Sequence, residues 1–108
     1  MVHKVLVIDD EAVLVETIAY NLEHAGYQVV TAVDGVSGLT PLSREMPDLI
    51  ILDLMLPEMG GLDFCRQVRR GKNTATIPIM MLTTRGEEID KDVFWSQAHF
   101  ITTSLYYK

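Results

Sequence analysis

The sequence contains little cysteine, no long apolar run and few basic residues. Cys65 is the single cysteine among 108 residues, which excludes an intrachain disulfide and a zinc site made of cysteines. The longest apolar run, residues 49–56, is interrupted by Asp53 and is far shorter than the roughly 20 residues of a transmembrane helix. Nine Lys and Arg residues against fifteen Asp and Glu residues give a net charge of −6. Such an acidic surface repels phosphate groups, so we expect no direct binding to nucleic acid or to an anionic membrane.

The sequence does contain enough apolar material for one folded domain. Hydrophobic residues make up 48% of the chain and charged residues 22%, which is typical of a globular domain rather than a disordered chain. The length allows one core and leaves no room for a second domain. We therefore expect a single domain over residues 1–108, without a cleavable leader and located in the cytoplasm.

Short apolar runs alternate along the chain with segments of helical periodicity. Predicted strands cover residues 4–8, 27–32, 49–52, 77–82 and 100–103. Predicted helices cover residues 11–25, 34–46, 61–70 and 86–97. This alternation indicates right-handed β-α-β crossovers and a parallel sheet with helices on both faces. Pro41 falls inside the second predicted helix, where it removes a backbone donor, so we expect that helix to be split or shortened.

Three aspartates follow predicted strands. Asp9 and Asp10 come directly after the first strand, and Asp53 comes after the third. In an open parallel sheet, ligands bind outside the carboxyl ends of the strands. In the flavodoxin-like strand order 2-1-3-4-5 the first and third strands are neighbours, so these carboxylates would converge on one cleft. Taken singly, each has a structural interpretation as well, since Asp10 could cap a helix and Asp53 could begin a turn.

Three carboxylates in one cleft repel one another and raise each other's pKa unless a cation neutralises them. Mg²⁺ fits this need, because it binds through one or two carboxylates and keeps several waters. A carboxylate beside such an ion suits phosphoryl transfer, in which Asp53 would attack in line. Thr83 ends the fourth apolar run and would place a hydroxyl at the same edge, although a threonine there is ordinarily structural.

The segments that carry these residues resemble the receiver domain of bacterial two-component response regulators. The matching stretches are residues 5–11 (VLVIDDE), 47–57 (PDLIILDLMLP) and 78–83 (PIMMLT). The resemblance implies an α/β, flavodoxin-like three-layer fold with a five-stranded parallel sheet in the order 2-1-3-4-5. It also implies that Asp53 accepts a phosphoryl group from a sensor histidine kinase, so the domain would be a phosphoacceptor and not an enzyme.

The same resemblance implies a ligand set and an output. Mg²⁺ would be held by Asp9, Asp10, Asp53 and the backbone carbonyl of Met55. Thr83 would contact the phosphoryl group and couple phosphorylation to movement of the fourth helix. Residues 53–70 most resemble regulators with a winged-helix DNA-binding domain, which would be attached to this chain or removed from it.

The resemblance weakens after about residue 91. Receivers have a lysine at the end of the fifth strand, and this position is taken here by Thr103 or, by strict counting from Thr83, by Leu105. The chain also leaves no room for a fifth helix, so we expect a receiver that is truncated or altered at this end. A frameshift, an engineered change and natural divergence would each produce such an end. The uncovered sheet face would favour cover by the chain's own aromatic residues, a homodimer or a strand-exchanged dimer.

Two functions of different classes therefore remain. One is a receiver that switches its output on phosphorylation, and the other is a degenerate, non-phosphorylated pseudo-receiver that serves as an interaction or dimerisation module. The second follows from the missing lysine, whose ammonium would stabilise charge at the transferring phosphoryl group. A small FMN-binding electron carrier shares the fold class. The acidic loop after the first strand excludes it, because an FMN phosphate needs hydroxyls and backbone donors there.

Overall fold

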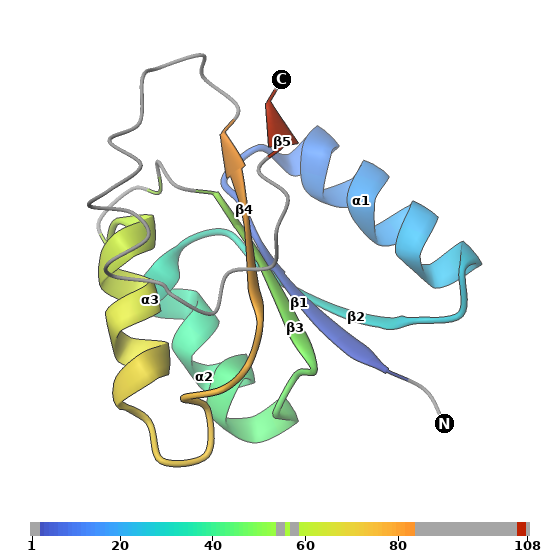
Figure 1. Ribbon diagram of the computed structural model, residues 1–108. Coiled ribbons are helices and arrows are strands. Elements are labelled where there is room, and N and C mark those ends of the chain that lie inside the picture. Colours follow the sequence, from blue (N-terminus) through green and yellow to red (C-terminus); the bar gives the residue numbers. More distant parts are fainter. Residues whose placement is uncertain (1–2, 54–55, 57–58, 84–105, 108) are drawn as a thin grey trace.

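A computed structural model describes residues 3–53, 56, 59–83 and 106–107 of the chain. Its strands are β1 (Lys4–Ile8), β2 (Gln28–Ala32), β3 (Leu49–Asp53), β4 (Ile79–Thr83) and β5 (Tyr106–Tyr107). Its helices are α1 (Ala12–His24), α2 (Gly35–Glu45) and α3 (Gly61–Arg70). The five strands form one parallel sheet in the order β2-β1-β3-β4-β5, with α1 on one face and α2 and α3 on the other (Figure 1). The predicted fold class and strand order are confirmed.

The core lies on both faces of the two central strands. Successive residues of a strand point to opposite faces, so Val5 and Val7 pack on the α1 side while Leu6 and Ile8 pack on the side of α2 and α3. The larger cluster is on the latter side. It includes Leu6, Ile8, Ile50, Leu52, Leu42, Phe64 and Val68. Continuous apolar runs such as those of β1 and β3 are what a parallel strand covered on both faces requires.

Helix α1 is packed more lightly than the other two described helices. The predicted apolar stripe of Leu14, Ile18 and Leu22 does face the sheet and contacts the cluster around Val5 and Val7. No residue of α1 is fully buried, however, whereas α2 and α3 both bury several. The α1 face of the sheet is therefore the thinner side of the core among the described residues.

Helix α2 runs unbroken through Pro41, so the predicted split or shortening is wrong. Its first turn is fixed by a reciprocal pair of bonds, in which Ser37 N donates to Asp34 Oδ1 at 2.7 Å and Asp34 N donates to Ser37 Oγ at 3.3 Å. A proline removes a single intrahelical bond, whereas Gly38 and Leu42 bury this face of the helix against the core. Tertiary packing of the buried face outweighs the local defect.

The last described strand also differs from the prediction. Tyr106 and Tyr107 pair with β4, opposite Leu82 and Thr83, while the strand predicted at residues 100–103 lies outside the described residues. Aromatic residues favour strands as β-branched residues do, so the sequence pattern alone does not distinguish residues 106–107 from residues 100–103 as the last strand. The helix predicted over residues 86–97 also lies outside the described residues.

Arg69 on α3 fixes the segment that leads into β4. Its Nη1 atom donates to the carbonyl oxygen of Ala75 at 3.0 Å and to that of Ile77 at 2.8 Å. Thr74 in the same segment donates its hydroxyl to the carbonyl of Val68 at 2.7 Å, and this bond is buried. These bonds tie the end of α3 to the segment that leads into β4.

At Gly38, helix α2 lies close against the sheet. A methyl group on Gly38 would lie 2.7 Å from Cδ1 of Ile8 and 3.2 Å from Cε1 of Phe64, both of them buried. Carbon atoms in favourable contact are about 3.5–4.0 Å apart. The helix and the sheet are thus spaced for a residue without a side chain.

We expect Gly38→Ala to lower the free energy of unfolding by about 1–3 kcal/mol because of overpacking, although alanine favours a helix by about 1 kcal/mol. Urea denaturation followed by circular dichroism measures this. Ser43→Ala, on the exposed side of the same helix, is the control and should change stability by less than about 0.5 kcal/mol. A Gly38→Ala protein as stable as the wild type would show that Ile8 and Phe64 can move aside.

Candidate metal site at the strand ends

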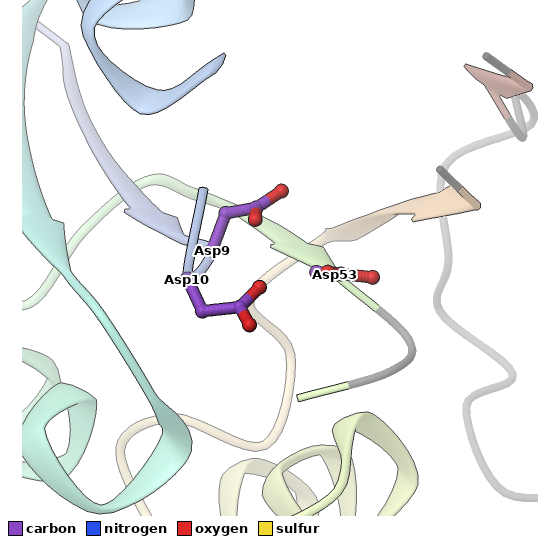
Figure 2. A group of neighbouring side chains, drawn as sticks. All are labelled: Asp9, Asp10 and Asp53. Atoms are coloured by element: carbon purple, nitrogen blue, oxygen red, sulfur yellow. The ribbon is translucent and has the colours of Figure 1, made fainter. Parts of the chain in front are cut away.

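Parallel pairing brings the three predicted aspartates together. Asp9 follows β1 directly and Asp53 is the last residue of β3, and these neighbouring strands are in register with Ile8 opposite Leu52. One carboxylate oxygen from each of Asp9, Asp10 and Asp53 can be chosen so that all lie within 4.8 Å of one another. Figure 2 shows the three side chains extending from the strand ends toward the same side. The expected convergence of the carboxylates is therefore present.

The three carboxylates differ in burial. Asp9 and Asp53 are both fully buried, with 0% of each residue exposed, while Asp10 is exposed. The backbone of Asp9 is held by a 3.2 Å bond from its N–H to the carbonyl of Ala32 in β2. The cluster therefore has two carboxylates set into the protein and one at the surface, which leaves an approach from solvent.

Asp9 has one oxygen that is satisfied and one that is not. Its Oδ1 accepts a hydrogen bond from the N–H of Glu11 at 2.9 Å. Its Oδ2 is buried and has no hydrogen-bond partner among the residues that the structure describes. A buried carboxylate oxygen without a partner costs free energy. A cation between the carboxylates would supply that partner.

The electrostatics of the cluster also favour a bound cation. Burial raises the pKa of Asp9 to about 6, and the charges of Asp53 and Asp10 add to that rise, while the hydrogen bond from Glu11 opposes it. Near neutral pH the protein therefore holds Asp9 ionised at a cost. A divalent cation would favour the ionised form of all three carboxylates.

The donor set fits Mg²⁺. It consists only of carboxylate oxygens, which are the ligands that hard cations prefer, and the exposed position of Asp10 leaves room for bound waters. Among the described residues this is the one group of three or more acidic, histidine or cysteine side chains with such spacing.

The other predicted site residues are only partly placed. Thr83 ends β4, one residue beyond Leu82, which is the register partner of Asp53, so its backbone lies at the same edge of the sheet. Met55 lies outside the described residues, as do Thr103 and Leu105. Their predicted roles stay predictions.

Sequence reasoning missed the residue that aligns β3 with β1 at the opposite end of the pair. The carboxylate of Asp48 accepts from the N–H of Lys4 at 2.8 Å, and the N–H of Asp48 donates to the carbonyl of Lys4 at 2.8 Å. Asp48 directly precedes β3, as its place before the buried run of residues 49–52 could have indicated. These two hydrogen bonds help fix the register that sets Asp9 beside Asp53.

Comparison with known proteins agrees with this geometry. A family model described as the response regulator receiver domain matches residues 5–99. The alkaline phosphatase synthesis transcriptional regulatory protein PhoP of Bacillus subtilis is 49% identical over 88 residues, which are 82% of this chain and 36% of that protein. The DNA-binding dual master transcriptional regulator RpaA of Synechocystis sp. is 46% identical over 88 residues, with the same coverage of 82% and 36%.

Solved structures agree as well. The crystal structure of the N-terminal domain of a response regulator receiver protein from Methanoculleus marisnigri matches with a TM-score of 0.84 and 28% identity. That match covers 100% of this chain and 85% of the other. The chain thus matches a receiver domain over its whole length, yet it spans less than half the length of the two curated relatives. In the described part of the chain, no helix is long and apolar enough to cross a membrane.

The raised pKa of Asp9 predicts how pH affects stability in the absence of divalent ions. Asp9 has a pKa of about 6 in the folded state against 3.8 for an ordinary aspartate, so the folded state binds its proton more tightly. Protonation of Asp9 therefore stabilises the folded state. This stabilisation is complete below pH 3.8 and is lost as the pH rises through about 6. Asp9→Asn, which keeps an oxygen for the N–H of Glu11, should therefore be more stable than the wild type at pH 7, by about 1–3 kcal/mol.

Urea denaturation at pH 4 and pH 7 with a chelator present measures this difference. The advantage of Asp9→Asn should shrink toward zero at pH 4. Glu16→Gln, which removes an exposed carboxylate from α1, is the control and should show no comparable gain. An Asp9→Asn advantage of the same size at both pH values would contradict the electrostatic explanation.

Proposed function

Because the chain belongs to the response regulator receiver family, we propose that it is a phosphorylation switch in which Asp53 accepts a phosphoryl group from a sensor histidine kinase in the presence of Mg²⁺. The observation that carries this proposal is the cluster of Asp9, Asp10 and Asp53, in which a buried oxygen of Asp9 has no hydrogen-bond partner among the described residues. A cluster of this kind has no evident structural use, because its carboxylates repel one another.

The chemistry divides among the residues of this cluster. A carboxylate oxygen of Asp53 attacks the phosphorus of a phosphohistidine in line. The new O–P bond forms as the P–N bond breaks, and the imidazole nitrogen leaves with the bonding electron pair. Asp9 and Asp10, with Asp53 and the backbone carbonyl of Met55, would hold Mg²⁺. When bound, Mg²⁺ neutralises charge on the phosphoryl oxygens as the transfer proceeds.

Thr83 is the proposed reporter of phosphorylation. Its position at the end of β4, beside the strand that carries Asp53, suits a hydroxyl that donates to a phosphoryl oxygen. Movement of Thr83 toward the phosphoryl group would shift the segment that follows β4. The resemblance to receivers implies that such a movement couples phosphorylation to output. The domain is changed by the reaction and does not turn over like an enzyme.

The output is proposed from the relatives. PhoP is a transcriptional regulatory protein and RpaA is a DNA-binding transcriptional regulator, and this chain spans 36% of each. We propose that the chain acts as the receiver part of a transcription regulator whose DNA-binding domain lies outside it. Its partner is a cytoplasmic histidine kinase domain. The net charge of −6 supports a division of labour in which this domain does not itself bind DNA.

Asp53→Asn tests the phosphoacceptor. Wild-type protein incubated with Mg²⁺ and acetyl phosphate should show a phosphoryl mass shift in intact mass spectrometry, and Asp53→Asn should show none, because an amide oxygen is a much weaker nucleophile. Asp63→Asn removes an exposed carboxylate from α3 and is the matched control, which should be phosphorylated like the wild type. A mass shift that survives in Asp53→Asn would place the acceptor elsewhere.

One feature favours a second candidate, the pseudo-receiver that acts as an interaction or dimerisation module. The two positions predicted for the lysine that ends the fifth strand of receivers, Thr103 and Leu105, carry no ammonium, although Lys108 directly follows β5 in the sequence. Removing one such charge-stabilising donor typically costs roughly 10²–10³ in rate. A domain with this loss would bind Mg²⁺ and still transfer phosphoryl groups slowly or not at all.

Restoring the charge separates the two candidates. If the missing ammonium limits the reaction, Thr103→Lys or Leu105→Lys should raise the initial rate of phosphorylation by acetyl phosphate roughly tenfold or more. Thr40→Lys, on the exposed side of α2, adds the same charge away from the site and is the control. No gain from either substitution, together with no wild-type phosphorylation, would favour the pseudo-receiver.

A further inference from the structure

Strand β2 forms an outer edge of the sheet, and part of its backbone has no neighbouring strand. The N–H of Gln28, the first residue of β2, donates to the carbonyl of His3 at 2.9 Å, just before β1. Backbone groups of successive residues point to opposite sides of a strand, so the N–H and C=O groups of Val29 and Thr31 face away from β1. Among the described strands none lies beyond them (Figure 1).

This edge lacks the features that commonly protect an exposed strand from pairing, which are lysines, prolines and bulges. Residues 25–33 contain no charged residue and no proline. All of β2 is in unbroken register with β1, from Gln28 to Ala32. Thr31 is exposed, and Val30 is only half-buried although it packs against the core. The edge therefore offers backbone donors and acceptors together with apolar side chains.

The strand is complementary to a second copy of itself. When two copies pair antiparallel about Val30, Val29 of each copy lies opposite Thr31 of the other. Both residues carry outward N–H and C=O groups, so each of these pairs exchanges two hydrogen bonds, as a hydrogen-bonded antiparallel pair does. A register centred on Val29 or on Thr31 would, within the strand, pair only that residue with its own copy. The register about Val30 thus uses the outward groups of both.

The same register brings together exposed apolar residues at the two ends of the strand. Tyr27, directly before β2, is 40% exposed, and Val33, directly after β2, is 63% exposed. Both are equally far from Val30 in the sequence, so Tyr27 of one copy lies opposite Val33 of the other. Aromatic and β-branched residues form a favourable cross-strand pair. Backbone hydrogen bonding and apolar burial therefore favour one and the same register.

Charge favours a second copy as the occupant of this edge. The chain has a net charge of −6, so two copies repel one another on average. Residues 25–33 carry no charge, so two β2 edges meet without like charges between them. The same lack of charge gives an acidic or basic peptide no complementary group to recognise.

We propose that β2 is a self-association edge, through which two copies of the chain pair antiparallel about Val30 and join their sheets. Val30 of each copy lies beside the two-fold axis and becomes covered by its counterpart. An interface of a single short strand is small, so the dimer is weak and forms at high protein concentration. The pairing needs neither Mg²⁺ nor a phosphoryl group, so it goes beyond the proposed function and does not depend on it.

Thr31→Pro tests the edge, because it removes an outward N–H from each copy and leaves the bonds to β1 in place. Sedimentation of the wild type from about 10 µM to about 1 mM, with a chelator and no phosphodonor, should show a dimer. Thr31→Pro should raise the dimer dissociation constant roughly tenfold or more, because two hydrogen bonds are lost. Thr31→Val keeps the N–H and is the matched control, which should stay within about twofold.

Cysteine cross-linking tests the register. Val30 would face its own counterpart in a non-hydrogen-bonded pair with Cα atoms about 4.5 Å apart, which a disulfide can span. In oxidised glutathione Val30→Cys should give a disulfide-linked dimer. Thr31→Cys, which lies opposite Val29, should give little. The native Cys65 is buried, and burial raises its pKa to about 12, so it should not compete as a thiolate.

A wild type that stays monomeric at the highest concentration overturns the inference and leaves the edge to another partner. A folded Thr31→Pro protein that dimerises like the wild type does so too, as does cross-linking of Thr31→Cys as fast as that of Val30→Cys. Circular dichroism shows whether each variant is folded, and if Thr31→Pro is not, the two cysteine variants decide. Failure of phosphorylation or of Mg²⁺ binding would contradict the proposed function and leave these results unchanged.

Discussion

The parallel pairing of β1 with β3 is the constraint on which the site depends. Because parallel strands run in the same direction, their carboxyl ends arrive at the same edge of the sheet, and the register that sets Ile8 opposite Leu52 sets Asp9 beside Asp53. The bonds between Asp48 and Lys4 hold that register at the other end of the pair. The buried strands β1 and β3 thus bring together like charges that repel one another.

Much of this architecture could be predicted from the sequence. The apolar runs and helical stripes placed the elements from β1 to β4 to within one or two residues, because a buried parallel strand and an amphipathic helix leave distinct patterns. The convergence of Asp9, Asp10 and Asp53 followed from chain direction alone once the strand order was given. The family that the sequence resembles is the one whose model matches residues 5–99.

The remaining features depend on tertiary contacts that a linear pattern does not contain. Pro41 breaks a local rule, and only the burial of Gly38 and Leu42 explains why α2 continues through it. Tyr106 and Tyr107 form a strand because they pair with β4. The sequence pattern did not indicate this, since short aromatic and β-branched runs predict strands equally well. The closeness of Gly38 to Ile8 joins residues that are far apart in the sequence, so no spacing could have indicated it.

The light packing of α1 has a consequence for the site that it borders. Among the described helices α1 buries no residue, and few buried apolar contacts are typical of the parts of a protein with low local stability. Asp10 lies just before this helix, whereas Asp9 is tied to β2 through the carbonyl of Ala32. The two adjacent aspartates therefore differ in their support, since Asp9 is bonded to the central sheet and Asp10 borders the described helix that buries least. Of the three carboxylates offered to a cation, two are built into the core and one depends on the surface layer.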